Sequence, residues 1–225
     1  MHEKVLASVP LFSGLTEDQL ATIARGLKRR IYQERGQIFT KGAPGDGMYL
    51  IVSGKVKVTV QEDEDETIVA VLRAGDFFGE LSVIDGEVRS ANVVALEPTE
   101  VLFLAKSDFE RTLVEVPEIA VALLQEVAGR LRRATSWIRA LSSQDVYGRI
   151  AGQLLHLSKM HGIDVPSGRR IPLRLTQNDL AGIIGASRES VNKAMGFFKS
   201  KGVISVDSSY HVTIHDPETL RKRSQ

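Results

Sequence analysis

The chain has 225 residues, with 29 Lys and Arg, 28 Asp and Glu and no cysteine, which excludes disulfides and a thiolate-bound iron–sulfur cluster. This length is enough for two modest domains that each bury a core. The net charge of +1 conceals an asymmetry, because residues 146–225 contain 12 basic and 6 acidic residues, whereas residues 1–145 contain 17 and 22. The C-terminal part therefore has the charge expected of a polyanion-binding domain.

Several classes of protein are disfavoured by what the sequence lacks. No apolar run approaches the roughly 20 residues of a membrane span, and the N-terminus lacks the apolar core of a signal peptide, so we expect a cytoplasmic protein without membrane association. No histidine lies between residues 3 and 155, which argues against haem and leads us to expect no prosthetic group. Nucleophile elbow, Walker loop and metal-hydrolase motifs are all missing, so we do not expect an enzyme.

Residues 36–105 have the pattern of an all-β barrel or roll. Short runs of alternating apolar residues are separated by glycine and acidic turns. The predicted strands lie within residues 36–42, 47–54, 55–60, 67–72, 91–96 and 101–105. The acidic run at residues 62–66 is interpreted as a solvated hairpin loop, because it lacks the ligand spacing of a calcium loop.

Residues 78–91, FGELSVIDGEVRSA, resemble an anion-binding segment in their chemistry. Gly79 permits close approach of the backbone, Glu80 can accept from sugar hydroxyls, and Arg89 with Ser90 can bind a phosphate. The alternative is a surface loop in which Arg89 pairs with one of its neighbouring carboxylates, Glu80, Asp85 or Glu87.

After Pro117 the pattern becomes helical, with apolar residues stepping by alternate fours and threes. These seam positions are Ala120, Leu124, Val127, Leu131, Ala134, Ile138 and Leu141. About three heptads of this pattern favour a homodimer formed by two such helices, although packing within the same chain is the alternative. Residues 142–146 are the predicted hinge, where Asp145 can cap the following helix.

Residues 175–201 are predicted to form a helix-turn-helix. Thr176 and Asp179 have the spacing of a cap with an acidic partner, Gly185 suits the left-handed turn, and Ser187 can cap the second helix. On that helix one face is apolar, with Val191, Ala194, Met195 and Phe198. Two β-like runs, residues 203–206 and 210–214, surround a turn at 207–209 and complete a winged motif.

The other face of the second helix carries polar groups suited to base edges. Arg188 can donate twice to guanine, Glu189 can accept from cytosine, and Lys193 can donate to guanine or phosphate, with Asn192 beside them. The alternative is a solvated ion pair between Glu189 and Lys193. The winged motif around these residues favours DNA binding. For the basic residues 221–223 we expect a frayed tail, and contact with DNA phosphates is the alternative.

Taken together, the three motifs resemble the Crp/Fnr family of bacterial transcription regulators over nearly all 225 residues. They occur in the family's order: a phosphate-binding cassette, a dimerisation helix, and a winged helix-turn-helix containing GASRESVNKAM. The resemblance implies an α+β fold, with a β-roll effector domain at residues 1–115, a dimerisation helix and hinge at 116–145, and a winged helix-turn-helix domain at 146–225. It also implies double-stranded DNA with a pseudo-palindromic site and RNA polymerase as partners.

Residue by residue, the resemblance implies that Glu80 binds a ribose 2′-hydroxyl and that Arg89 and Ser90 bind a cyclic phosphate. Gly79, Leu81 and Ser82 would supply backbone around the ring. Alignment through residues 145–151 places Arg130, Ala134 and Thr135 near the purine. Ala134 departs from the threonine of the family's cyclic AMP receptors, so the cassette supports a cyclic nucleotide more firmly than it supports adenine.

For DNA, the resemblance places base contacts at Arg188, Glu189 and Lys193, with Thr176, Ser187 and Asn192 also at the interface. Lys193 stands where a well-known member of the family has arginine, and lysine lacks the bidentate fork. We therefore predict a homodimeric, effector-controlled DNA-binding regulator. Cyclic AMP is the first choice of effector, and cyclic GMP or a dinucleotide is the alternative.

Two other functions remain open. One is a constitutive DNA-binding regulator with a degenerate pocket. The other is a nucleotide-binding module whose helix-turn-helix meets a protein.

Overall fold

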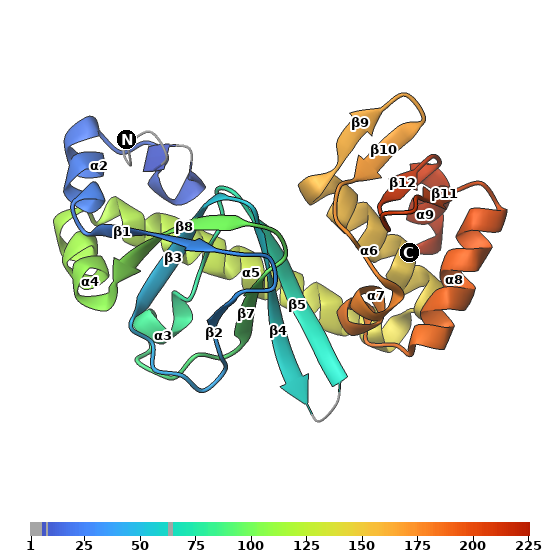
Figure 1. The fold of residues 1–225 in the computed structure, drawn as a ribbon, viewed down its shortest axis with the longest axis horizontal. Helices are drawn as coiled ribbons and strands as arrows, with labels where there is room; N and C mark the ends of the chain where they lie inside the picture. The colour runs from blue at the N-terminus through green and yellow to red at the C-terminus, as the bar shows by residue number, and fades with distance from the viewer. Residues whose placement is uncertain (1–5, 8, 63–64) are drawn as a thin grey trace. The chain divides into compact units, whose positions relative to one another are not determined.

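The computed structural model describes residues 6–7, 9–62 and 65–225 (Figure 1). The chain forms two compact units, residues 1–132 and 133–225, and the division falls within the long helix α5 (Glu118–Ser143). A β-rich first unit, a long helix and a winged helix-turn-helix confirm the predicted α+β fold class. Among the described residues, no helix is long and apolar enough to cross a membrane.

The first unit is built on two four-stranded sheets, ordered β1-β8-β3-β6 and β2-β7-β4-β5 (Figure 1). The strands are β1 (Leu27–Tyr32), β2 (Gln37–Phe39), β3 (Gly47–Ser53), β4 (Lys55–Glu62), β5 (Asp65–Arg73), β6 (Phe77–Phe78), β7 (Asn92–Ala95) and β8 (Thr99–Ala105). The sequence missed β1, which is rich in charge, and β6, which is only two residues long. The acidic run predicted as a loop at residues 62–66 does connect β4 to β5, but Glu62, Asp65 and Glu66 belong to the paired strands themselves. Residues 63 and 64 lie outside the described residues.

Successive side chains of β3 and β8 point to opposite faces of their sheet, so the core of the first unit has two layers. Tyr49 and Phe103 belong to the cluster between the two sheets. Met48 and Leu104 point the other way, into a cluster with the surrounding helices. These helices are η1 (Pro10–Phe12), α2 (Glu17–Ala24), α4 (Lys106–Glu115) and the start of α5. The short helix α3 (Leu81–Ile84) follows β6 and carries the start of the predicted cassette.

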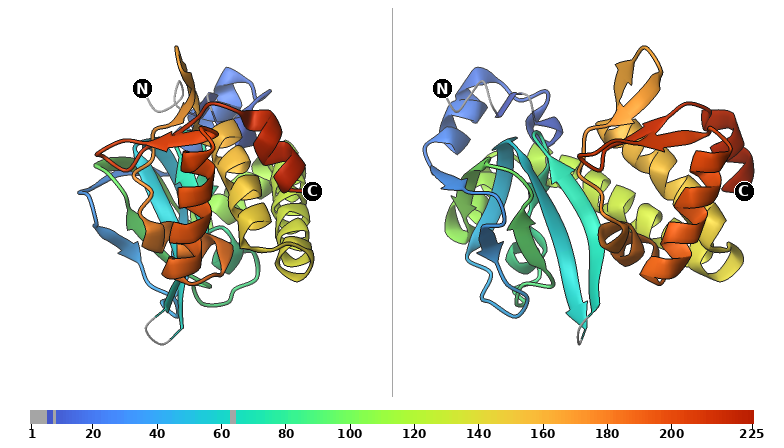
Figure 2. Two further views of the ribbon diagram at one scale, coloured as in Figure 1. Left: turned by 90° about the vertical axis from the view of Figure 1, so that its right-hand side faces the viewer. Right: turned by 45° about the vertical axis from the view of Figure 1, so that its right-hand side comes forward.

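The second unit begins within α5 and continues with α6 (Val146–His161), which Asp145 caps by accepting from Gly148 N at 2.9 Å. The remaining elements are β9 (Ile163–Val165), β10 (Gly168–Ile171), α7 (Gln177–Ile184), α8 (Arg188–Ser200), β11 (Ile204–Val206), β12 (Val212–Ile214) and α9 (Pro217–Arg223). Its sheet is ordered β11-β12-β10-β9, with the strands labelled in Figure 1. Figure 2 shows this unit from two further sides. The hairpin of β9 and β10 was not predicted.

The expectation of a frayed basic tail is wrong, because residues 217–223 form helix α9. Asp216 caps this helix by accepting from the backbone of Glu218 and Thr219, and Leu220 is fully buried. Arg223 at its end forms an ion pair with Asp145. The cap and the buried leucine therefore stabilise a helix where the basic sequence suggested a frayed end.

Candidate functional site

Arg89 lies at the centre of the predicted cassette, with only 2% of its surface exposed. Its Nη1 donates to Gly79 O at 2.7 Å and to Ser82 Oγ at 2.8 Å. Its Nη2 donates to Asp46 Oδ1 at 2.8 Å and to Gly47 O at 2.7 Å. A guanidinium has five N–H groups, and the fifth, on Nε, is buried and has no hydrogen-bond partner among the residues that the structure describes. The protein has therefore fixed the position of this arginine and left one donor unsatisfied.

The carboxylate that pairs with Arg89 is not one of the three expected neighbours. It is Asp46, which lies 43 residues earlier in the sequence. Asp46 precedes β3, and its side chain is 60% exposed. Sequence reasoning missed Asp46 because nothing local links it to the cassette. The centre of the Phe39 ring lies 4.3 Å from the guanidinium carbon of Arg89, so this ring covers one face of the guanidinium.

Gly79 is required at its position for two reasons. Its φ of 79° lies in the left-handed region that favours glycine. A Cβ at this position would lie only 2.7 Å from Arg89 Nη1. We expected this glycine to admit a close backbone contact, and in the structure it admits the guanidinium of Arg89.

Glu80 and Arg130, two predicted ligand residues, form an ion pair with Arg130 Nη1 at 3.0 Å from Glu80 Oε1. Glu80 is only 2% exposed, whereas Arg130 comes from α5 and is partly exposed. Arg130 also donates to Phe77 O at 2.8 Å and to Glu126 at 3.3 Å. Burial raises the pKa of Glu80, and the opposing effect of Arg130 only partly offsets it.

The other predicted ligand residues differ in their burial. Ser82 is buried and bonded to Arg89, while Leu81 is exposed at the start of α3. Ser90 is exposed next to Arg89 in the chain. Thr135 is exposed on the part of α5 that belongs to the second unit, and its role near a purine stays a prediction.

The predicted caps and turn of the helix-turn-helix are confirmed. Thr176 Oγ1 accepts from Asp179 N at 3.1 Å, and Asp179 Oδ2 accepts from Thr176 N at 2.9 Å. Gly185 ends α7 with a left-handed φ of 60°. Ser187 Oγ accepts from Ser190 N at 3.2 Å and caps α8. Thr176 and Ser187 therefore have a structural role, and their contact with DNA stays a prediction.

Helix α8 has the two faces that its sequence predicts. Its apolar residues Val191, Ala194, Met195 and Phe198 are all buried. The polar residues Arg188, Glu189, Asn192 and Lys193 are all exposed. Glu189 and Lys193 form the expected ion pair at 2.7 Å, and Asn192 accepts from Gln177 at 2.8 Å. Such exposed pairs are weak, so they can be exchanged for contacts with a ligand.

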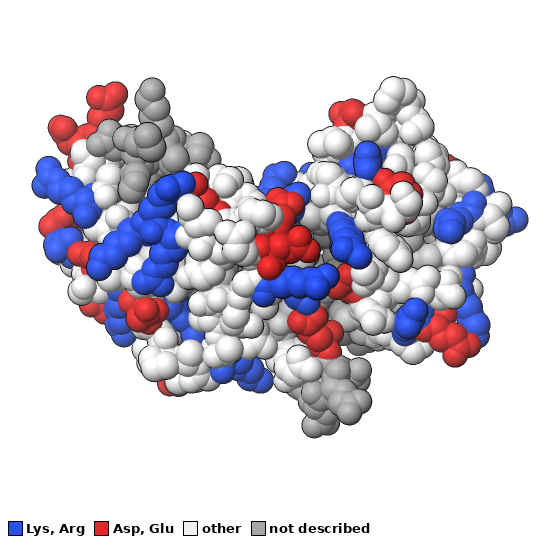
Figure 3. All heavy atoms as spheres, viewed as in Figure 1, with Lys and Arg blue, Asp and Glu red and all other residues white. Residues whose placement is uncertain are grey.

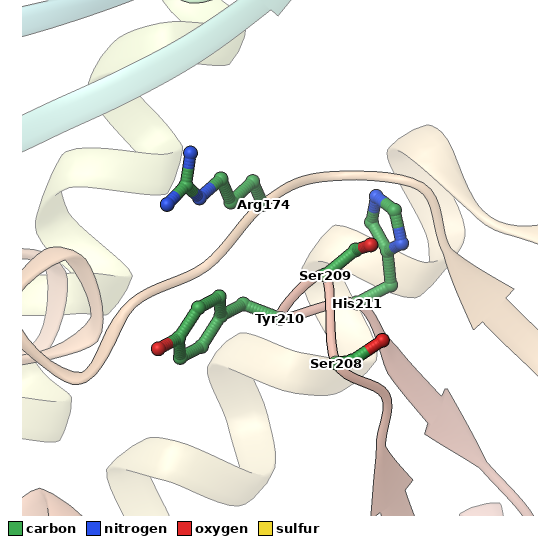
Figure 4. A pocket seen from close by; sticks show the side chains of 5 residues that line it. All are labelled: Arg174, Ser208, Ser209, Tyr210 and His211. Carbon is green, nitrogen blue, oxygen red and sulfur yellow. The ribbon is translucent and has the colours of Figure 1, made fainter.

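The wing carries a hollow of about 370 Å³ (Figure 4). It is lined by Arg174, Ser208, Ser209, Tyr210 and His211. The Arg174 guanidinium carbon lies 5.6 Å from the centre of the Tyr210 ring. Hydroxyl groups and a guanidinium are donors that suit a phosphate oxygen.

The net positive charge of the C-terminal part does not by itself locate an interface. On the face drawn in Figure 3, Lys and Arg side chains lie at several separate points of the second unit, with Asp and Glu among them. The capped helix α8 and the wing hollow locate the candidate nucleic-acid surface more specifically than the charge does.

Comparisons with known proteins match both units. Residues 29–115 match the model of the cyclic nucleotide-binding domain, and residues 148–223 match that of the Crp-like helix-turn-helix domain. A CRP-like cAMP-activated global transcriptional regulator of Mycobacterium tuberculosis (strain CDC 1551 / Oshkosh) is 32% identical over 224 residues, covering 99% of this chain and 100% of that protein. These relatives are transcription regulators rather than enzymes.

One further relative and one solved structure are also similar to this chain. A global nitrogen regulator of Synechocystis is 30% identical over 220 residues, covering 93% of this chain and 97% of that protein. The structure of the c-di-GMP-responsive global regulator CLP of Xanthomonas campestris superposes with a TM-score of 0.77 over 89% of this chain and 99% of that one. At 23% identity, this second likeness is one of fold alone.

Proposed function

Because the chain belongs to the Crp/Fnr family of DNA-binding transcription regulators and contains a cyclic nucleotide-binding domain, we propose that it acts as a homodimer whose affinity for DNA is controlled by a cyclic nucleotide. Cyclic AMP is the first choice of effector and cyclic GMP is the alternative. The protein would work in the cytoplasm without a prosthetic group, binding double-stranded DNA at promoters and contacting RNA polymerase there.

The observation that carries this proposal is the state of Arg89. A buried arginine with its position fixed by four hydrogen bonds and with one N–H unsatisfied is a preformed anion site. A single negative charge, such as that of a cyclic phosphate, can accept from Nε without displacing the bonds on Nη1 and Nη2. Ser90, exposed beside it, can donate a second hydrogen bond.

Glu80 would bind the ribose of the same ligand. A 2′-hydroxyl donates to a carboxylate, and Glu80 would have to share its charge between that hydroxyl and Arg130. Because Arg130 belongs to α5, ligand binding at Glu80 acts on the helix that carries the predicted dimer seam. Arg130 and Thr135 are assigned to the purine. Ala134 has no hydrogen-bonding group with which to distinguish adenine from guanine.

The seam on α5 is the proposed dimer contact, and its occupant is a second copy of this chain. Leu124, Leu131 and Ile138 are 69%, 68% and 64% exposed in the single chain. Large apolar side chains at heptad spacing are buried when two such helices pair. We expect Leu124→Asp to lower the fraction of dimer in sedimentation velocity.

Val121 provides the matched control, because it is 57% exposed on the same helix but lies off the seam. Val121→Asp should leave the dimer intact. A Leu124→Asp variant that sediments as the wild type does would contradict the assigned seam.

On DNA, each copy would place α8 in the major groove, with Arg188, Glu189 and Lys193 facing base edges. Thr176, Ser187 and Asn192 would lie at the same interface. A twofold dimer implies two half-sites about one helical turn apart in a pseudo-palindromic site. The wing hollow would receive a backbone phosphate, because Arg174 and the hydroxyls around it are donors.

One observation favours a second candidate, a ligand-independent regulator. Arg89 and Glu80 already have partners within the protein, so the pocket is largely satisfied without a nucleotide. In this candidate the two ion pairs only stabilise the β-roll.

Calorimetric titration of nucleotide-stripped protein distinguishes these two candidates. We expect micromolar binding of cyclic AMP, or of cyclic GMP if Ala134 has changed the purine preference. Absence of heat with both nucleotides, in protein that still binds DNA, would support the ligand-independent regulator and overturn our proposal.

A further inference from the structure

Arg149 lies in the first turn of α6, immediately after the break that separates α5 from α6. Its guanidinium donates to three main-chain carbonyls from two other parts of the second unit. Nη1 donates to Gln144 O at 2.9 Å, and Nε donates to Ile184 O at 3.0 Å. Nη2 approaches Gly185 O at 3.4 Å.

All three acceptors lie at the C-terminal ends of helices. Gln144 N donates to Ala140 O, so Gln144 continues the last turn of α5. Ile184 is the last residue of α7, and Gly185 is its C-cap. The final carbonyls of a helix lack partners within the helix and carry the negative end of its dipole, so a cation is stabilising there. One guanidinium therefore caps two helices at once.

The end of α5 also lies against the turn of the helix-turn-helix. A Cβ at Gly185 would be 3.4 Å from Leu141 Cδ2, which is ordinary van der Waals contact. Two residues after Gly185, Ser187 caps α8. The last turn of α5 therefore contacts the turn between α7 and α8, and a shift of α5 would act directly on the residues that precede α8.

A second set of contacts holds the same hinge from α9. Gln144 Nε2 donates to Ser224 O at 2.5 Å, and Asp145 pairs with Arg223. These bonds connect the hinge to the C-terminal helix rather than to α7. A variant that removes one of these contacts therefore loosens the hinge while it leaves the Arg149 contacts in place.

We propose that Arg149 is the positioning residue that couples the end of α5 to α8, the proposed recognition helix. The fork can satisfy the carbonyls of α5 and α7 together only in one relative placement of these ends, so movement of α5 must either carry α7 with it or break the shared cap. The shared cap is then either kept or broken, and a nucleotide that favours one of these two arrangements would bias the placement of α7. The inference rests on the proposed control of DNA binding by a nucleotide.

The test compares DNA affinity with and without the nucleotide that binds in calorimetry, measured by fluorescence anisotropy. We expect Arg149→Ala to reduce the nucleotide-induced gain in DNA affinity by about 3- to 30-fold. Nucleotide affinity without DNA should stay within about twofold of the wild type, because Arg149 does not line the cassette. Reciprocity requires DNA to lose the same factor in its effect on nucleotide affinity.

Two further variants separate coupling from simple support of the fold. Arg149→Lys keeps the charge but not the fork, so we expect an intermediate gain. Arg221→Ala removes only an ion pair between exposed side chains on α9 and should behave as the wild type. Arg223→Ala should change the gain less than Arg149→Ala does, because it loosens the hinge only from α9.

Equal weakening of DNA binding with and without nucleotide in Arg149→Ala would overturn the inference, because it would show only a structural role. Should Arg149→Ala fail to fold, a wild-type gain in Arg149→Lys would overturn it as well. If the wild-type protein binds a nucleotide but its DNA affinity does not change, both this inference and the proposed function are overturned. If the wild type shows the gain and the Arg149 variants lose it, both are supported.

Discussion

The cassette and the recognition helix present their charged groups in opposite ways. Arg89 and Glu80 are each only 2% exposed and are already bonded to Asp46 and Arg130. In α8, the side chains of Lys193 and Glu189 are 67% and 77% exposed and are joined by one surface ion pair. One region is a preformed buried network, and the other is a set of exposed side chains on a rigid helix.

The two regions therefore differ in what binding of a ligand requires. A ligand in the cassette must join a network whose partners are fixed, so binding there depends on geometry and changes the contacts of Arg130 on α5. A ligand on α8 displaces only water, ions and a weak pair, so binding there should depend strongly on salt. In the proposed mechanism, control of DNA binding therefore comes from the cassette and the hinge.

The largest expected effect is that of Arg89→Ala on nucleotide binding. Truncating the charged partner of a buried, hydrogen-bonded contact with a ligand typically costs about 2–5 kcal/mol of binding free energy, roughly 30-fold or more in affinity. Calorimetry should show loss of nucleotide binding, while nucleotide-independent DNA binding stays unchanged.

Arg29→Ala is the matched control for Arg89→Ala, because Arg29 pairs with Glu100 at 2.6 Å on the surface of the same unit. This variant should bind nucleotide as the wild type does. Normal nucleotide binding by Arg89→Ala would mean that the cassette has been assigned to the wrong residues.

On the recognition helix, Arg188→Ala should weaken binding to the preferred DNA site by about 1–3 kcal/mol, roughly 5- to 150-fold, and relax the preference at one base pair. Competition with a library of single-base site variants checks this, and nucleotide affinity should not change. Equal weakening on every sequence would show that Arg188 contacts phosphate rather than a base.

A smaller effect is expected from pH, through Glu80. Burial raises the pKa of Glu80 above its usual value of 4.5, so the folded protein retains this proton at a pH where the unfolded chain has lost it. This contribution to stability is complete below pH 4.5 and is lost as the pH rises through the raised pKa. Nucleotide affinity should change in the opposite sense, since only the carboxylate accepts well from a ribose hydroxyl.

Titrations across this range should show nucleotide affinity falling on acidification in the wild type. Glu80→Gln should bind more weakly and remove this pH dependence. A pH profile that is the same in both proteins would exclude Glu80 as the titrating group.

The smallest effect is expected at the wing. Arg174→Ala should weaken DNA binding about equally on all sequences and reduce the slope of log affinity against log salt by about 1, as expected for the loss of one phosphate contact. An unchanged slope would mean that the hollow at the wing does not meet the DNA backbone.

The parts of the molecule that the sequence predicts best are those decided by near neighbours. The cap at Thr176, the left-handed Gly185 and the buried face of α8 each depend on residues within one or two helical turns. The contacts missed by the sequence join distant segments. Asp46 reaches Arg89 across 43 residues, and Arg149 reaches Ile184 across 35. The order of α9 depends on burial of Leu220, which only the tertiary fold provides.

The proposed mechanism requires that a nucleotide in the cassette change how tightly the protein binds DNA. It is tested most directly by measuring the affinity of the wild-type protein for its preferred DNA site at one fixed salt concentration, with and without saturating cyclic AMP or cyclic GMP. We predict tighter binding, by about 5- to 150-fold, with one of the two nucleotides. Equal affinity in all three conditions would show that neither nucleotide controls DNA binding.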